Sequence, residues 1–135
     1  HRDLHKEYRR QRQMCIRDRY GFEANMAELM TASDVVVTKA GPSTVMEALN
    51  CGRPLLLSSA IPGQEDGNVR MVVEGGAGWW TPHPSHVLER LHRLRKSGQL
   101  ELDDAAAATQ KLVTPGAAHN VAREIIALLS ELART

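Results

Sequence analysis

The stretch "VVVTKAGPSTVMEALNCGRPLLL", from Val35 to Leu57, decides the fold. Its leading valines predict a strand buried on both faces, because β-branched runs without polar alternation are typical of central parallel strands. Gly41 and Pro42 end this strand. Pro42 suits the first turn of a helix, and Ser43 or Thr44 can cap that helix. Gly52 suits the residue that follows the helix, and the leucines after it predict a second strand. The stretch therefore predicts a strand–helix–strand unit of a parallel sheet.

The rest of the chain continues this alternation. The other expected elements are a helix over 25–31 capped by Asn25 with Met26, Leu29 and Met30 inward, a helix over 68–74 with Val69, Val72 and Val73 inward, a weak strand over 77–80, a helix over 85–96 capped by Ser85, and helices over 102–112 and 118–132. This order predicts an α/β fold, a partial Rossmann-like parallel sheet with flanking helices. So few strands indicate an incomplete doubly wound domain.

Composition excludes several classes of protein. The chain has 135 residues and a net charge of +1, so bulk charge indicates no nucleic-acid partner. Cys15 and Cys51 form no CxxC pair, which argues against a zinc site or a disulfide framework and suits a reducing compartment. We find no signal peptide and no apolar run of the roughly 20 residues that a membrane span needs. Because the chain opens on His1, we expect a piece of a longer protein.

The N-terminal residues differ from the rest. Residues 1–19 carry seven basic side chains, which we interpret as a solvated surface rather than a phosphate-binding arm. Within them, 1–13 suit a polar helix, whereas 14–19, "MCIRDR", show no period and are expected to be non-native. We therefore divide the chain into a basic segment over 1–19, non-native in part, and an incomplete domain over 20–135.

The first loop after a strand has the chemistry of an anion site. A helix that starts near Pro42 offers free N–H groups and the positive end of its dipole. Gly41 lets the backbone approach a ligand, Ser43 and Thr44 add hydroxyl groups, and Lys39 adds charge. The order of residues is not that of a P-loop. The loop therefore suits a diphosphate.

Glu47 has two interpretations. Its carboxylate can accept hydrogen bonds from the two hydroxyls of a ribose. Alternatively, Thr44 and Glu47 form a capping box, in which Glu47 bonds the backbone N–H of the cap. The local pattern by itself favours the capping box.

The second loop, "PGQEDGN" over 62–68, follows the next strand. It gathers Gln64, Glu65, Asp66 and Asn68, whose amides and carboxylates can bind the hydroxyls of a sugar. By itself the loop reads as a polar surface turn. However, ligands of open α/β sheets bind at the carboxyl ends of the strands, where both loops lie. Together the loops predict a pocket for a nucleotide sugar.

The residues at these loops resemble a known family. "TKAGPSTVMEAL" and "IPGQEDGNVRMVVEGGAG" closely resemble the donor-binding half of monogalactosyldiacylglycerol synthases and processive diacylglycerol glucosyltransferases, which are GT-B glycosyltransferases of family 28. "AAAATQKLVTPGAAHNVAREIIALL" resembles the C-terminal helices of the galactolipid synthases in particular. The resemblance covers Gly21 to about Leu132. It implies the C-terminal half-domain of a GT-B fold.

The resemblance also implies roles for residues. Glu47 would bind the ribose, which reverses the local preference for the capping box. The other implied contacts are the diphosphate with Lys39, Gly41, Ser43 and Thr44, the donor hexose with Gln64, Glu65 and Asn68, and the uracil with Phe22 and Glu23. The donor would be UDP-galactose or UDP-glucose, with no cofactor and no metal required.

The family's fold has an N-terminal domain that is absent here. That domain carries the acceptor site and the catalytic base, so no catalytic residue is expected in this chain, and the chain alone should be inactive. The intact enzyme would be cytoplasmic and peripheral on the membrane surface, where it would transfer hexose to diacylglycerol or a glycolipid. Alternatives are a peptidoglycan-precursor transferase that uses UDP-N-acetylglucosamine and a non-catalytic nucleotide-binding module. Two departures from the family are "MCIRDR" in place of a β-branched strand and Ser43 in place of glycine.

Two further features bear on packing. Alternation along a strand places one of Trp79 and Trp80 in the core and the other at the crevice or in solvent. The last helix is rich in isoleucine and leucine, and we expect it to lack part of its docking surface. We therefore expect a marginal or aggregating protein when this chain is expressed alone.

Overall fold

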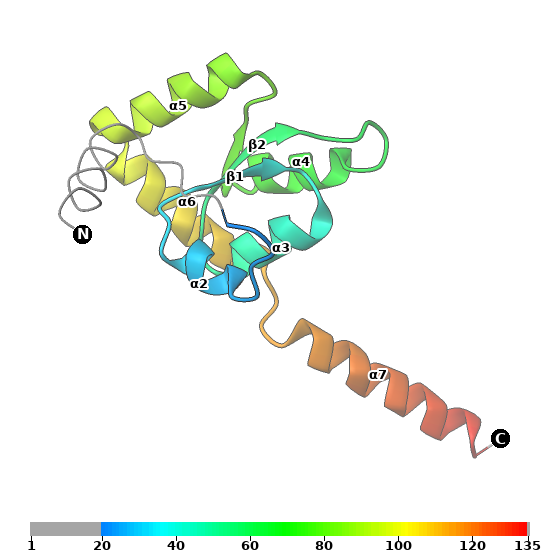
Figure 1. Ribbon diagram of the computed structural model, residues 1–135. Coiled ribbons are helices and arrows are strands. Elements are labelled where there is room, and N and C mark those ends of the chain that lie inside the picture. The colour runs from blue at the N-terminus through cyan, green and yellow to red at the C-terminus, as the bar shows by residue number, and fades with distance from the viewer. Residues whose placement is uncertain (1–19, 135) are drawn as a thin grey trace.

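Three short parallel strands form the centre of the fold in the computed structural model, which describes residues 20–134. The strands are β1 (Val36–Lys39), β2 (Leu55–Ser59) and β3 (Gly78–Trp80), in the order β1-β2-β3. The helices are α2 (Met26–Thr31), α3 (Pro42–Asn50), α4 (Asp66–Glu74), α5 (Pro84–Ser97), α6 (Gln99–Leu112) and α7 (Ala117–Leu132) (Figure 1). This order confirms the predicted α/β fold. The interpretations of 1–13 and 14–19 lie outside the described residues.

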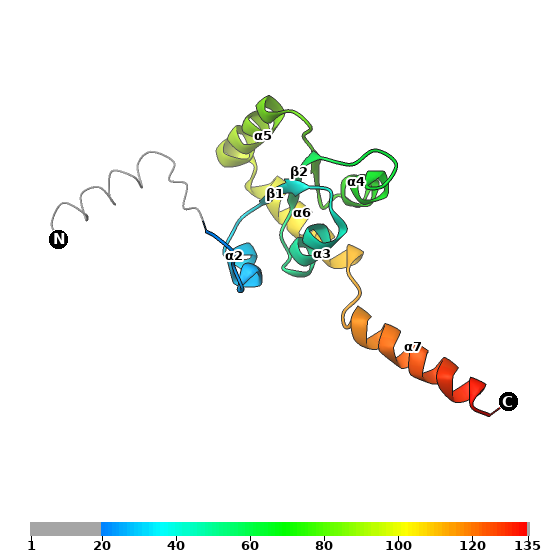
Figure 2. The same ribbon diagram turned by 45° about the vertical axis from the view of Figure 1, so that its right-hand side comes forward.

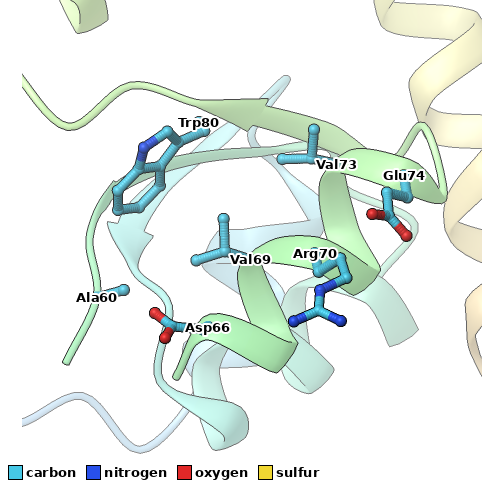
Figure 3. A pocket seen from close by; sticks show the side chains of 7 residues that line it. All are labelled: Ala60, Asp66, Val69, Arg70, Val73, Glu74 and Trp80. Carbon is cyan, nitrogen blue, oxygen red and sulfur yellow. The ribbon is translucent and has the colours of Figure 1, made fainter. Parts of the chain in front are cut away.

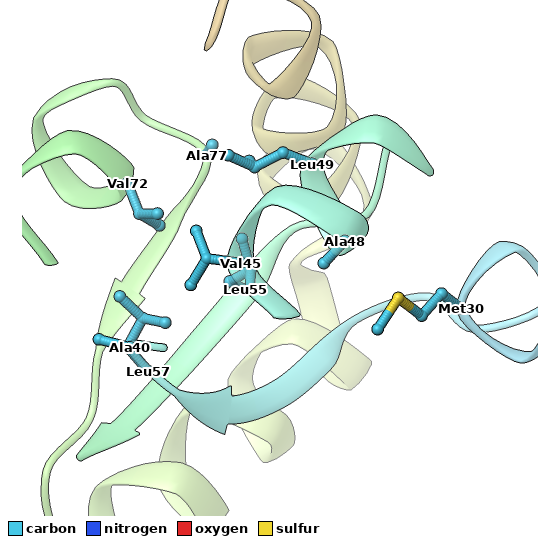
Figure 4. Close-up of a cluster of buried hydrophobic side chains, with 9 residues drawn as sticks. All are labelled: Met30, Ala40, Val45, Ala48, Leu49, Leu55, Leu57, Val72 and Ala77. Carbon is cyan, nitrogen blue, oxygen red and sulfur yellow. The ribbon is translucent and has the colours of Figure 1, made fainter. Parts of the chain in front are cut away.

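The core lies between the sheet and the helices that cross over it. Leu55 and Leu57 on β2 are fully buried, and they pack with apolar residues of α3 and α4 (Figure 4). Leu56 points to the opposite face because side chains alternate along a strand. It is also fully buried, and α5 contacts β2. A strand with a neighbour on each side and helices above and below has no route to water, so β2 reads as an unbroken apolar run.

The prediction that the Val35–Val37 strand is buried on both faces is wrong. Burial along β1 alternates, and the Val37 side chain is 46% exposed. Val36 packs against the core cluster under α3, whereas Val37 lies on the face that carries Leu56. Among the described residues, β1 is an edge strand. A valine run therefore marks a strand but does not tell how many faces are covered.

Helix starts differ from the predictions in one respect. Pro42 begins α3 as expected, but the N-cap residue is Gly41, and neither Ser43 nor Thr44 caps the helix. Similarly, α5 begins at Pro84 rather than after Ser85. In both cases the proline takes the first helical turn, which places the hydroxyl residue inside the helix.

The cap of α2 also differs. Asn25 is the N-cap residue of α2, but its side chain makes no capping hydrogen bond. Its backbone N–H instead donates to the carboxylate of Glu23 at 2.9 Å. The acceptor for this helix start therefore comes from the preceding turn.

Two positions predicted to face the core are exposed. Met26 is 43% exposed, because α2 is short and packs inward through Met30. Val73 is 41% exposed, and Val72 is the buried residue of α4.

The last helix stands apart from the rest of the fold. Gly116 adopts a left-handed conformation (φ 68°) and turns the chain into α7, which extends away from the sheet (Figures 1 and 2). α7 has no buried residue. Its large apolar side chains are 52–73% exposed, namely Val121, Ile125, Ile126, Leu128, Leu129 and Leu132. Within 20–134 α7 is therefore undocked, and the expectation that part of its docking surface is missing stays a prediction. Neither α7 nor any other helix within 20–134 combines the length and the apolar character that crossing a membrane requires.

Candidate functional site

The two polar loops meet at one edge of the sheet. The first joins β1 to α3 through Ala40 and Gly41, and the second joins β2 to α4 over residues 60–65. Since β1 and β2 are parallel neighbours, both loops leave from their carboxyl ends. α3 begins at the same edge of the sheet, and the backbone N–H groups of its first turn have no partner within the helix.

An ion pair joins the loops. The Nζ atom of Lys39 lies 2.6 Å from Oε1 of Glu65. The Oε2 atom of Glu65 accepts a hydrogen bond from the backbone N–H of Ile61 at 2.9 Å. The Glu65 side chain is only 3% exposed, whereas that of Lys39 is 57% exposed. Both carboxylate oxygens are therefore engaged inside the protein.

The same contacts shift the pKa of the Glu65 carboxyl. The hydrogen bond from Lys39 lowers the pKa of the Glu65 carboxyl below its ordinary value of 4.5, and the hydrogen bond from Ile61 lowers it further. Burial acts in the opposite direction but does not prevail. The carboxylate is therefore ionised at neutral pH, and its negative charge balances the positive charge of Lys39.

Two side-chain hydrogen bonds reinforce this junction. The Asn68 side chain donates to the carbonyl oxygen of Ala40 at 2.8 Å. The Ser58 hydroxyl donates to the carbonyl oxygen of Thr38 at 3.1 Å. Asn68 thus connects the first turn of α4 to the first loop. The loops are held as one unit, which pre-organises the edge of the sheet.

Gly41 provides the space for the ion pair. The residue is buried at the start of α3, and its φ of −68° is open to any amino acid. A Cβ atom added there would lie 3.0 Å from Nζ of Lys39 and 3.6 Å from Oε1 of Glu65. The glycine is therefore needed for room rather than for backbone conformation.

Four predicted ligand residues keep their side chains free at this edge. Ser43, Glu47 and Gln64 are exposed, and Thr44 is half-buried. None of the four makes a side-chain hydrogen bond to another residue within 20–134. The capping box that the local pattern favoured is not formed, because Thr44 lies inside α3 and the helix has no side-chain cap. The Glu47 carboxylate is left available to a ligand.

The predicted uracil contacts lie elsewhere. Phe22 and Glu23 precede α2, and Phe22 is fully exposed. In the described part of the chain, no hydrogen bond or ion pair joins either residue to the two loops. Their role in uracil binding stays a prediction.

A shallow pocket that the sequence did not predict lies beside the second loop (Figure 3). Its volume is about 430 Å³, and it is lined by Ala60, Asp66, Val69, Arg70, Val73, Glu74 and Trp80. Trp80 is 41% exposed, whereas Trp79 is half-buried with the guanidinium of Arg90 5.1 Å from its ring centre. The strand alternation of the tryptophans was the sequence signal for an exposed ring at this place.

Comparisons with known proteins indicate the family to which these loops belong. A model of the glycosyltransferase family 28 C-terminal domain matches residues 4–123. The chain is 40% identical over 105 residues to monogalactosyldiacylglycerol synthase 3, chloroplastic, of Arabidopsis thaliana, a match that covers 78% of this chain and 23% of that protein. It is 39% identical over 111 residues to the probable monogalactosyldiacylglycerol synthase 3, chloroplastic, of Oryza sativa subsp. japonica, covering 82% of this chain and 22% of that protein.

The chain spans less than a quarter of the length of these relatives. The residues that the family model matches include the strands, the two loops and both residues of the ion pair between them. The chain therefore belongs to glycosyltransferase family 28, and its match is to the C-terminal domain of that family.

Proposed function

We propose that this chain is the UDP-sugar-binding part of a glycosyltransferase that moves galactose or glucose from UDP to diacylglycerol or a glycolipid. Family 28 membership supports a nucleotide-sugar donor. The relatives named above are monogalactosyldiacylglycerol synthases, which favours galactose and diacylglycerol over the UDP-N-acetylglucosamine of a peptidoglycan-precursor transferase. The same match favours an enzyme over a non-catalytic nucleotide-binding module.

The diphosphate fits the N-terminus of α3. Free N–H groups and the positive end of the helix dipole favour an anion at this place. The exposed hydroxyl of Ser43 and the half-buried hydroxyl of Thr44 add donors, and Lys39 adds a positive charge beside Gly41. The same groups would stabilise the negative charge that develops on UDP as it leaves.

The single observation that carries the proposal is the free carboxylate of Glu47. The residue is exposed, and it takes no part in capping α3, which has no side-chain cap. Glu47 follows Ser43 by four residues, so its carboxylate lies about one helical turn beyond the start of α3. That placement suits the ribose hydroxyls of a nucleotide whose diphosphate binds at the helix N-terminus.

The acceptor and the base are proposed to lie elsewhere. We place no catalytic base among residues 20–134, and we assign the lipid acceptor to the N-terminal domain that the resemblance implies. The chain alone is then expected to bind the donor without transferring sugar. Since the acceptor is a lipid, the intact enzyme is proposed to be peripheral on a membrane surface. The relatives are named as chloroplastic proteins, so the expected cytoplasmic location stays a prediction.

Isothermal titration of the chain with a panel of nucleotides tests the proposal. The panel is UDP, UDP-galactose, UDP-glucose and UDP-N-acetylglucosamine, with ADP-glucose as the control for the base. Binding of UDP and of the UDP-hexoses, with UDP-galactose at least as tight as UDP-N-acetylglucosamine, is the expected result. Equal binding of ADP-glucose would contradict uracil recognition, and no binding by the folded chain would contradict the donor site.

A further inference from the structure

We infer that Glu65 is a positioning residue, which holds the ammonium of Lys39 over Gly41 for the diphosphate. This inference rests on the proposed function and deepens it. It changes the role that the family resemblance implied for Glu65, which was a direct contact with the sugar.

Both oxygens of the Glu65 carboxylate are engaged inside the protein, and burial closes their remaining lone pairs to a sugar. One oxygen lies 2.6 Å from Nζ of Lys39, and the other accepts the N–H of Ile61 at 2.9 Å. With the side chain only 3% exposed, a sugar hydroxyl reaches it only if Lys39 or the loop around Ile61 moves aside. Displacing Lys39 would leave a buried charge unpaired, which is costly.

Lys39, by contrast, keeps donors for a ligand. Its ammonium has three N–H donors, and within residues 20–134 it donates to Glu65 alone. The side chain is 57% exposed, so the remaining donors are open to solvent at the edge of the sheet. A lysine without this ion pair would lose much of its rotamer freedom on binding a phosphate. Because the ion pair already restricts the Lys39 side chain, part of this entropy is lost before the phosphate binds.

The place where Lys39 is held is the start of α3. The ammonium lies 3.0 Å from where a Cβ of Gly41 would be, and Gly41 is the N-cap residue of that helix. The ammonium is therefore held beside the positive end of the helix dipole, where a diphosphate is favoured.

Asn68 and Gln64, which also lie in the stretch over 62–68, have different roles. Asn68 donates its side-chain amide to the carbonyl oxygen of Ala40 at 2.8 Å, so it also holds the first loop. Gln64 is exposed, and its side chain makes no hydrogen bond in the described part of the chain. Gln64 keeps the hexose contact that the family resemblance implies, and it has a side-chain amide without a partner within 20–134.

The test is a set of titrations with UDP and with UDP-galactose. Glu65→Gln keeps the size of the side chain and an acceptor for Ile61, but removes the charge that holds Lys39. We expect it to weaken both ligands by the same factor, roughly three- to tenfold. Gln64→Ala is expected to weaken UDP-galactose and to leave UDP unchanged. Circular dichroism checks that each variant is folded.

A double-mutant cycle separates positioning from a general structural effect. In a Lys39→Met background, Glu65→Gln is expected to change the affinity for UDP by less than about twofold, because the group that it positions is gone. An effect that persists without Lys39 overturns the positioning role. A variant Glu65→Gln that weakens UDP-galactose but not UDP overturns it as well, since that pattern indicates a direct sugar contact.

Failure of the proposed function gives a different pattern. If the wild-type chain binds no nucleotide, the UDP-sugar proposal fails, and titration with inorganic pyrophosphate decides the inference. Pyrophosphate binding that Glu65→Gln weakens only when Lys39 is present supports the positioning role. Equal pyrophosphate binding by wild type and variant, or no binding at all, overturns it.

Discussion

The ammonium of Lys39 lies 2.6 Å from the carboxylate of Glu65, which joins the end of β1 to the start of α4. The two residues are 26 positions apart in the sequence. Their pairing fixes the relative placement of the loops that follow β1 and β2, and it places a positive charge at the N-terminus of α3.

The ion pair predicts how stability depends on pH. The hydrogen bond from Lys39 lowers the pKa of Glu65 in the folded state below the ordinary value of 4.5. The stability that this carboxylate contributes is therefore fully present above 4.5 and is lost as the pH falls through the folded-state pKa. We expect the difference in Tm between wild type and Glu65→Gln to be largest near neutral pH and to shrink below pH 4.5.

Thermal melts from neutral pH down to about one unit below the ordinary carboxyl pKa measure this difference. Glu124→Gln is the control, because Glu124 is an exposed carboxylate on α7 without an ion pair among residues 20–134. Its Tm at neutral pH is expected to match that of wild type. A Tm difference for Glu65→Gln that grows on acidification would contradict the account.

Two glycines are expected to respond differently to alanine. At Gly41 the added Cβ meets the flexible end of Lys39, so the chain folds but the ion pair must shift. At Gly78 the Cβ would overlap the backbone carbonyl oxygen of Leu55, which cannot move away within the sheet. We expect Gly78→Ala to cost about 3 kcal/mol or more of unfolding free energy.

Urea denaturation and UDP titration distinguish the two cases. Gly41→Ala should weaken UDP severalfold with a much smaller loss of stability than Gly78→Ala. Equal losses of stability in the two variants would show that the space beside Gly41 is not reserved for the Lys39 side chain.

Burial in the sheet predicts another contrast. Leu57 on β2 is fully buried, and Leu57→Ala is expected to destabilise the fold by about 2–5 kcal/mol through lost burial and a cavity. Val37 on β1 is 46% exposed, and Val37→Thr keeps the β-branched shape, so a change within about 0.5 kcal/mol is expected. Urea denaturation measures both. A loss at Val37 as large as that at Leu57 would mean that the outer face of β1 is covered.

The apolar face of α7 is expected to make the chain self-associate. Ile125 and Leu129 lie one turn apart on this face and are 52% and 60% exposed. Replacing both with lysine should shift the chain towards the monomer in sedimentation velocity experiments, because it adds charge to the face. Ala127→Lys, on the opposite side of the helix, is the matched control and should leave the association unchanged. A wild-type chain that is monomeric and melts reversibly would contradict this prediction.

The order of elements could be predicted from the sequence because its signals are local. The valines before Gly41, the proline at position 42 and the leucines after Pro54 each act within a few residues. The common edge of the two loops also follows from the parallel order of the strands. Helix caps were less predictable, since a proline and a serine side by side offer two starts, and the structure takes the proline.

The roles within the site depend on contacts that the sequence pattern does not show. "PGQEDGN" gives no sign that Glu65 turns inward to Lys39 while Gln64 stays exposed. The exposure of Val37 depends in the same way on which faces of β1 are covered, which a valine run does not reveal. The residue types at the site could be predicted from the sequence. Which of them hold the loops and which are open to a ligand could be seen only in the structure.

The most direct test of the central claim is the affinity of the chain for UDP, measured by isothermal titration for wild type and for Glu47→Ala. The ribose hydroxyls are proposed to bind this carboxylate. Loss of charged hydrogen bonds worth about 1.5–3 kcal/mol should weaken UDP by roughly tenfold to a hundredfold. Glu124→Ala, which removes an exposed carboxylate on α7, should bind as wild type does. Equal affinity of wild type and Glu47→Ala for UDP would contradict the account.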